Sequence, residues 1–208
     1  MVLFLRMYIQ WLGGNGFRIQ VEKTVVIIDP PSEQSGLRQN QLKADIVLNS
    51  TYGATDPERV KPQEAGCELI DSPGEYEAQG IFVYGIRAKN STLYVLNAEG
   101  VTIGHVAGIN GELSVDQLEL IEGVDVLLLP VGGHGVLSPK DAPDVISQIE
   151  PRIVIPMDYA VEGYAIERDP LSEFLKEVGA RAVEPQEKVK ITKKDLPSEE
   201  TEYYILTV

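Results

Sequence analysis

Short apolar runs, each followed by glycine, proline or a polar residue, constrain the fold of this chain most strongly. The segments Val124 to Leu129 and Ile153 to Met157 are almost entirely apolar, and Ile46 to Ser50 begins with three apolar residues. Strands with this pattern are covered on both faces of their sheet. We therefore expect a sheet that lies buried between other layers.

Further strands are predicted before and after these runs, because segments rich in β-branched and aromatic residues alternate with Gly, Asn and Pro. Residues 17–21 and 24–28 form a predicted hairpin across Glu22-Lys23, which Asp29-Pro30-Pro31 ends. The other predicted strands are Tyr8 to Leu12, Glu68 to Ile70, Ile81 to Ile86, Thr92 to Leu96, Val101 to His105 and Tyr203 to Val208.

Helices are predicted mainly in the second half of the chain. Ser114 is a candidate N-cap before SVDQLELI, and Asp141 to Ile149 has a helical pattern. A third helix begins at Asp169-Pro170 and ends before Gly179. Strands with helices packed outside them predict an α/β layered sandwich, in a single domain that spans residues 1–208.

The composition is that of a soluble protein and limits the partners. With 43% apolar residues, 24% charged residues and a net charge of −14, a nucleic acid or an anionic membrane is not expected as the main partner. A single cysteine excludes an intramolecular disulfide and fits a reducing compartment. No apolar stretch reaches the roughly 20 residues that span a bilayer, so we expect a cytoplasmic protein.

Residues that carry chemistry are few. The chain has two histidines, His105 and His134, and no HExxH, CxxC, phosphate-loop or GxSxG pattern. GGNGF at 13–17 favours a tight turn over a phosphate loop. His105 ends an apolar strand and His134 lies in a glycine-rich loop. Asp158 follows a buried strand, where a functional carboxylate or a plain turn residue could lie.

Seven segments taken together resemble the metallo-β-lactamase-fold hydrolases, in the branch of zinc-dependent hydrolases. In chain order they are IQWLGGNGF, VVIIDP, ADIVLNS, DSPGEYE, GIFVYGI, VDVLLLPVGG and IEPRIVIPMDY. The resemblance extends from Tyr8 to about Val208. It implies a four-layer αββα sandwich, which agrees with the layered sandwich expected from the strand and helix pattern.

The metal-ligand motifs of that family are degenerate in this chain. The resemblance places the four ligand positions of its HxHxDH loop on Thr51, Gly53, Thr55 and Asp56. Further ligand positions fall on Gly14, Ala107-Gly108 and Asp158, and a histidine-bearing loop after Ile86 is shortened. Zinc sites of this kind need several imidazole and carboxylate ligands. The sequence thus predicts no metal site and no cofactor.

Three hypotheses follow from this ligand loss. The main prediction is a non-catalytic protein that uses the scaffold for binding or assembly, with an unknown small molecule or protein as partner. The alternative is a metal-dependent hydrolase with an unusual site built from Asp56, His105 and Asp158. The third is a structural subunit whose apolar C-terminal EYYILTV adds to a neighbour's sheet, and a homo-oligomer is one form that this assembly could take.

The predicted cleft is the same in the first two hypotheses. No catalytic residue is assigned with certainty, and Asp56, His105 and Asp158 are the candidates. The cleft candidates share hydrogen-bonding capacity and a place after a predicted strand or in the glycine-rich loop: Thr51, Tyr52, Thr55, Asp56, His105, His134, Asp158 and Tyr159.

Overall fold

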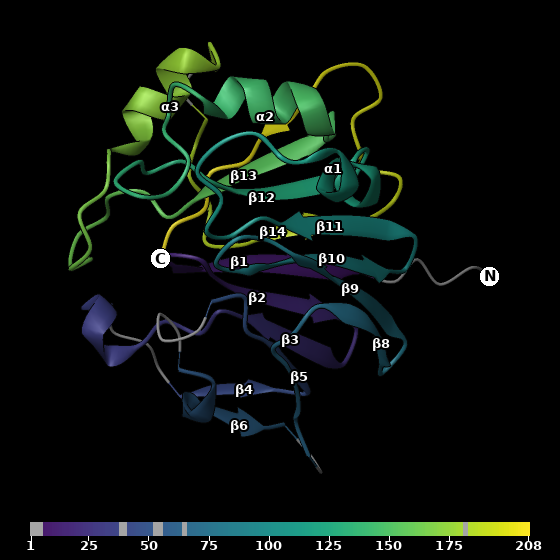
Figure 1. The fold of residues 1–208 in the computed structure, drawn as a ribbon. Coiled ribbons are helices and arrows are strands. Elements are labelled where there is room, and N and C mark those ends of the chain that lie inside the picture. The colour runs from purple at the N-terminus through teal and green to yellow at the C-terminus, as the bar shows by residue number, and fades with distance from the viewer. Residues whose placement is uncertain (1–5, 38–40, 52–55, 64–65, 181–182) are drawn as a thin grey trace.

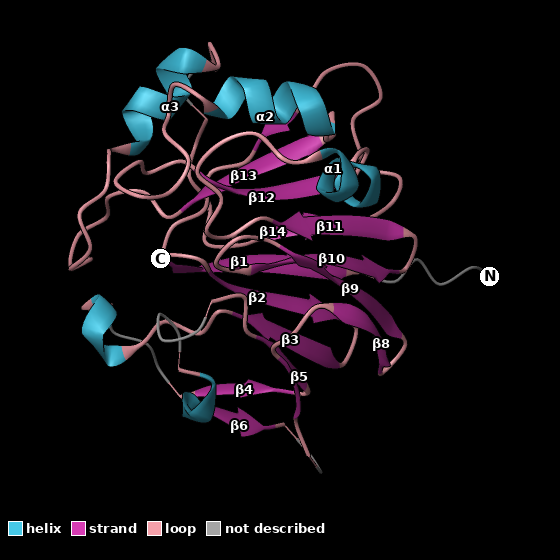
Figure 2. Ribbon diagram, viewed as in Figure 1, coloured by secondary structure: helices cyan, strands magenta, loops and turns pink. Residues whose placement is uncertain are grey.

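The fold consists of two large sheets packed face to face, with further layers outside each of them (Figures 1 and 2). It is described by a computed structural model. The structure describes residues 6–37, 41–51, 56–63, 66–180 and 183–208. The expected metallo-β-lactamase-like sandwich is confirmed.

The first sheet has six strands in the order β14-β1-β2-β3-β5-β7. Their bounds are β1 Met7–Gly13, β2 Gly16–Val21, β3 Thr24–Ile28, β5 Ile46–Leu48, β7 Glu68–Ile70 and β14 Val189–Ile191. β2 and β3 form the expected hairpin, whereas β3, β5 and β7 run parallel. Val26 and Ile28 of β3 face one hydrophobic cluster, and Val25 and Ile27 face another. The apolar run is thus explained by burial on both faces.

The second sheet has seven strands in the order β15-β13-β12-β11-β10-β9-β8. Their bounds are β8 Gly74–Ala78, β9 Ile81–Arg87, β10 Thr92–Ala98, β11 Val101–His105, β12 Val126–Pro130, β13 Ile153–Met157 and β15 Glu202–Tyr203. Four neighbouring strands of this sheet, β11, β12, β13 and β15, run parallel. Every residue of β12 and β13 is buried, as their apolar sequences predict.

The two outer layers differ. The α-helices α1 Val115–Ile121, α2 Ala142–Ile149 and α3 Leu171–Glu177 lie outside the seven-stranded sheet (Figure 2). Ser114 caps α1 in a reciprocal capping box with Gln117. Outside the six-stranded sheet lies the two-stranded ladder of β4 Leu42–Ala44 and β6 Val60–Pro62, with the 3₁₀ turns η1 Glu33–Ser35 and η2 Pro57–Arg59 nearby.

Two polar segments form edge strands that the sequence did not predict. DSPGEYE contributes β8, which pairs with β9, and KVKITKKDL contributes β14, which pairs with β1. Most residues of β8 are exposed, and β14 is only three residues long, so neither segment has the apolar run of a buried strand.

The C-terminal strand is shorter than expected. The expected strand was Tyr203 to Val208, but β15 ends at Tyr203 after two register pairs with β13, Ile153 and Val154. The chain then turns to residue 186 instead: Gln186 N donates to the Ile205 carbonyl and Thr207 N donates to the Gln186 carbonyl. Within the described ranges, no helix is long and apolar enough to cross a membrane.

Asp125 joins elements from both sheets. Its buried carboxylate accepts hydrogen bonds from Thr102 N at 2.9 Å and from Lys193 Nζ at 3.0 Å. The Asp125 carbonyl accepts a bond from Ile153 N at the start of β13. One carboxylate thus ties β11 and β12 to the segment after β14.

We predict that Asp125→Ala lowers the free energy of unfolding by about 3 kcal/mol, because it leaves a buried amide and an ammonium without their acceptor. Lys193→Met should cost no more than about 1 kcal/mol, because its ammonium is half exposed. Urea unfolding measures both changes. Equal losses for the two variants would contradict the role given to Asp125.

Candidate functional site

The site is organised by the turn between β1 and β2, residues Gly13-Gly14-Asn15-Gly16. Gly13 and Gly14 have φ angles of +90° and +55°, and a Cβ on Gly16 would lie 2.9 Å from the Asp29 carbonyl oxygen. Side chains are disfavoured in such conformations and at such close approaches. The glycine-rich stretch is therefore a tight turn, as its sequence predicts.

Two carbonyl groups of this turn hold groups from other strand ends. The Gly14 carbonyl accepts hydrogen bonds from Trp11 Nε1 at 2.9 Å and from the Asp158 amide at 3.0 Å. The Asn15 carbonyl lies 2.9 Å from His105 Nε2. The turn thus fixes residues that follow β13 and end β11.

His105 is a neutral imidazole of defined tautomer. It is fully buried, and burial lowers its pKa from 6.5 to about 4. Because the Asn15 carbonyl can only accept a hydrogen bond, Nε2 carries the proton. Nδ1 then presents a lone pair, and among the described residues this buried atom has no hydrogen-bond partner.

Asp29 is the second buried titratable group, in the turn that ends β3. Burial raises its pKa from 3.8 to about 7, with a smaller rise from the charge of Asp158. Its carboxyl accepts a hydrogen bond from Ser50 N at 2.7 Å and makes a short hydrogen bond with the Ser50 hydroxyl, both of which oppose that rise. Asp29 Oδ2 lies 3.8 Å from His105 Nε2.

Asp158 is buried opposite a cation. Arg168 Nη2 donates to Asp158 Oδ2 at 3.0 Å, and Arg168 Nε lies 3.0 Å from Oδ1 without hydrogen-bond alignment. The Tyr164 hydroxyl donates to Oδ1 at 2.7 Å, and burial together with the charge of Asp158 raises the pKa of Tyr164. Asp158 has φ +51°, a conformation that its backbone bond to the β1–β2 turn supports.

The remaining predicted residues occupy different places. Thr51 and Asp56 are half-buried, and the Asp56 amide donates to the Pro30 carbonyl beside Asp29. Tyr52 and Thr55 lie outside the described residues. His134 is exposed and lies 3.3 Å from Asp169, apart from the buried cluster. The Tyr159 hydroxyl donates to the Leu206 carbonyl, so this side chain belongs to a neighbouring pocket.

Several site residues were not predicted from the sequence: Asn15, Ser50, Tyr164 and Arg168. Asn15 acts through its carbonyl group, which every residue type carries. Arg168 follows Asp158 by ten positions within a loop, and no sequence pattern marks that pair. For Ser50, the available signal was its place in the polar pair Asn49-Ser50 that follows the apolar strand β5.

The described side chains do not form a complete metal site. Within the described ranges, no group of three or more His, Cys, Asp or Glu residues could hold a metal ion. Asp158 already faces Arg168, and Asp29 faces Ser50. His105 Nδ1 is the donor in this cluster whose chemistry suits a transition metal.

Comparison with known proteins assigns the family. A protein-family model described as "Beta-lactamase superfamily domain" matches residues 8–158. The chain belongs to the beta-lactamase superfamily. It is 34% identical over 212 residues to a UPF0173 metal-dependent hydrolase of Thermococcus kodakarensis, an alignment that covers 84% of this chain and 93% of the relative.

Two further similarities support this assignment. The UPF0173 protein PF0020 of Pyrococcus furiosus is 45% identical over 200 residues, with 85% of this chain and 93% of the relative covered, and its name gives no activity. A proposed Zn-dependent hydrolase of the metallo-beta-lactamase superfamily from Thermotoga maritima has a TM-score of 0.81 and 26% identity, with 97% of this chain and 100% of that chain covered. An alignment to a Thermococcus onnurineus relative spans 55% of that relative's length.

These relatives correct two predictions. The chain was expected to be a non-catalytic binding or assembly protein and to need no cofactor, but the relative from Thermococcus kodakarensis is named as a metal-dependent hydrolase and the similar structure from Thermotoga maritima as a Zn-dependent one. Both expectations are therefore wrong. They rested on the loss of ligands at the motif positions of the family, and that loss alone does not exclude metal dependence.

Asp29 and His105 should affect stability in opposite directions as pH changes. The folded state holds a proton on Asp29 up to about pH 7, whereas the unfolded state releases it near pH 3.8. The free energy of unfolding therefore falls, through this group, as pH rises from 3.8 to about 7. The folded state keeps His105 neutral down to about pH 4, whereas the unfolded state takes up a proton near pH 6.5. The free energy of unfolding therefore falls, through this group, as pH falls from 6.5 to about 4. Between about pH 4 and 6.5 the two effects oppose each other.

We predict that Asp29→Asn, relative to the wild type, becomes more stable as pH rises from 4 to 7. His105→Gln, relative to the wild type, should become less stable as pH rises from 4 to 6.5. Each slope should reach at most about 1.4 kcal/mol per pH unit, the value for one proton. Urea unfolding over this pH range gives both slopes, and slopes of the same sign would contradict the assignment of the two pKa shifts.

A substitution at Gly132 can test how tightly the backbone packs against Asp158. A Cβ at this buried position would lie 1.9 Å from the Asp158 carbonyl oxygen, whereas a Cβ at Gly111 would meet nothing within 4 Å. We predict that Gly132→Ala lowers the free energy of unfolding by about 2 kcal/mol or more. Gly111→Ala should change it by no more than about 0.5 kcal/mol. Thermal unfolding of both variants measures the difference.

Proposed function

We propose that this chain is a metal-dependent hydrolase whose reaction takes place at the cluster of Asp29, His105 and Asp158. The buried, unpartnered Nδ1 of His105 carries this proposal, because a desolvated nitrogen lone pair without a partner is costly unless it has a use. The names of the relatives support the reaction class.

The cluster has the proton chemistry that hydrolysis needs. A carboxyl with a pKa of about 7 can both hold and release a proton near neutral pH, and Asp29 is such a group. Its two bonds with Ser50 fix the orientation of the carboxyl. His105 stays neutral in the same range and offers Nδ1 as a proton or metal acceptor.

Asp158 and its partners form a rigid wall of the cluster. The guanidinium of Arg168 compensates the carboxylate charge, which is completely buried. Because breaking such a pair leaves a buried charge, the wall keeps its geometry when substrate binds. Asn15, Tyr164 and Arg168 are half-buried, so substrate would approach the cluster along these residues.

Cellular location and partners are also part of the proposal. The single cysteine, half-buried Cys67, suits a reducing compartment, and we propose a cytoplasmic protein. The net charge of −14 disfavours nucleic acid and anionic membranes as partners. A small-molecule substrate fits these limits, and a homo-oligomer is compatible with them.

We predict that the wild-type protein hydrolyses one of a panel of carboxylic esters, thioesters, lactones and phosphodiesters once Zn²⁺, Mn²⁺ or Fe²⁺ is supplied. His105→Gln should lower kcat/KM at least about 100-fold, because it removes the nitrogen lone pair. His134→Gln is the matched control and should stay within about threefold of the wild type. Steady-state assays after chelation and metal addition measure these values.

Three outcomes would contradict the proposal. Hydrolysis that survives chelation would exclude metal dependence, and equal losses in the two histidine variants would exclude His105 as the centre. Absence of hydrolysis across the panel, with metal bound according to elemental analysis, would exclude the reaction class. Thermal unfolding shows that each variant is folded.

A further inference from the structure

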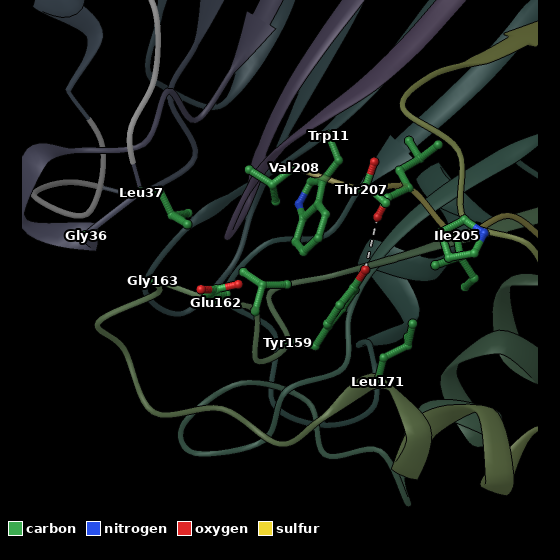
Figure 3. A pocket seen from close by; sticks show the side chains of 13 residues that line it. Trp11, Gly36, Leu37, Tyr159, Glu162, Gly163, Leu171, Ile205, Thr207 and Val208 are labelled. Carbon is green, nitrogen blue, oxygen red and sulfur yellow. Dashed lines mark hydrogen bonds between the residues drawn. The ribbon is translucent and has the colours of Figure 1, made fainter.

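A pocket of about 740 Å³ lies beside the cluster and takes no part in the chemistry described so far (Figure 3). It is lined by segments that are far apart in the sequence, namely the end of β1, the residues after η1, the loop after β13, the start of α3 and the C-terminal segment. Its lining residues are mostly apolar, and those that shape it are Trp11, Leu37, Tyr159, Val161, Leu171 and Val208.

The floor of the pocket is rigid. The Trp11 and Tyr159 rings lie 4.6 Å apart between centroids, and both side chains are almost fully buried. The Tyr159 hydroxyl donates to the Leu206 carbonyl at 3.2 Å, the bond drawn in Figure 3. Leu171, Val161 and Val208 are more exposed and stand at the opening. A preformed apolar hollow of this size suits a small-molecule group.

The pocket shares its support with the cluster. The Gly14 carbonyl accepts bonds both from Trp11 Nε1, in the pocket floor, and from the amide of Asp158, in the cluster. Asp158 belongs to the cluster, and the next residue, Tyr159, lines the pocket. The pocket floor and the cluster are thus held by the same turn, although Asp29, His105 and Asp158 do not line the pocket.

The charge of the lining selects against anions. Glu162 is the charged side chain among the lining residues, and it is exposed. Among the described residues that line the pocket, none is a lysine, arginine or histidine. A carboxylate or phosphate in the pocket would meet the charge of Glu162 without a compensating cation from these residues.

We propose that this pocket binds the uncharged alkyl or acyl group of the substrate, an ester or lactone without a charge on that group. The volume and the apolar lining of the pocket support a binding site without reference to hydrolysis. Its assignment to a substrate rests on the proposed hydrolase function.

The chain provides its own probe for this proposal. Trp11 is the single tryptophan and lies in the pocket floor, so its fluorescence reports occupancy. We expect uncharged 2-alkanones, which cannot be hydrolysed, to change this fluorescence saturably. Affinity should rise about three- to fourfold for each added methylene group until the pocket is full, from about 0.8 kcal/mol per buried CH₂.

Two variants test the chemistry of the lining. Leu171→Glu places a carboxylate at the opening, at the first residue of α3, where a helix tolerates an acidic side chain, and should weaken 2-nonanone binding at least tenfold. Leu120→Glu, at an exposed leucine of α1, is the matched control and should bind as the wild type does. Glu162→Gln should strengthen octanoate binding at least threefold and leave 2-nonanone binding unchanged.

The outcomes separate this proposal from the hydrolase proposal. An unchanged Trp11 fluorescence, an affinity independent of chain length, or equal binding by Leu171→Glu and the wild type would overturn the pocket assignment, even if hydrolysis is observed. Chain-length-dependent binding without any hydrolysis would keep the binding site and remove the hydrolase function. Thermal unfolding of each variant confirms that its fold is intact.

Discussion

The candidate site depends on two backbone carbonyl groups in the turn between β1 and β2. The carbonyls of Gly14 and Asn15 accept hydrogen bonds from Asp158 and His105 at the ends of β13 and β11, and the Gly14 carbonyl also accepts one from Trp11 of β1. The turn can reach this position because Gly13 and Gly14 adopt positive φ angles and Gly16 passes close to Asp29. A single four-residue turn thus sets the tautomer of a histidine, the position of a carboxylate and the floor of a pocket.

Burial then gives these groups their chemical character. Removed from water, Asp29 keeps its proton to a higher pH and His105 loses its proton at a lower pH, because burial disfavours the charged form of each group. The carboxylate of Asp158 is surrounded by Arg168 and Tyr164. The layered scaffold makes this possible, since the strand ends that carry these residues lie between two sheets.

Much of the fold is predictable from the sequence, because the apolar runs of β3, β5, β12 and β13 are read directly as strands covered on both faces. The hairpin at Glu22-Lys23 and the N-cap at Ser114 follow from local turn and capping chemistry. Edge strands β8 and β14 were not predicted, since their exposed faces carry polar residues.

The site was predictable only in part. His105 and Asp158 follow apolar strands and could be named from the sequence. Their partners could not, because the Asn15 acceptor is a backbone atom and Arg168 lies in an irregular loop. The prediction of a non-catalytic protein was wrong because it gave most weight to the missing ligands of the HxHxDH loop, although His105, whose Nδ1 has no partner among the described residues, had been named as a candidate.

The nitrogen-15 NMR spectrum of the two imidazoles, with His134→Gln to assign them, tests the central claim most directly. At neutral pH the account predicts that His105 is uncharged, with its proton on Nε2 and a lone pair on Nδ1, and that added Zn²⁺ shifts the Nδ1 resonance. A charged ring, a proton on Nδ1, or a spectrum of His105 unchanged by Zn²⁺ would contradict it.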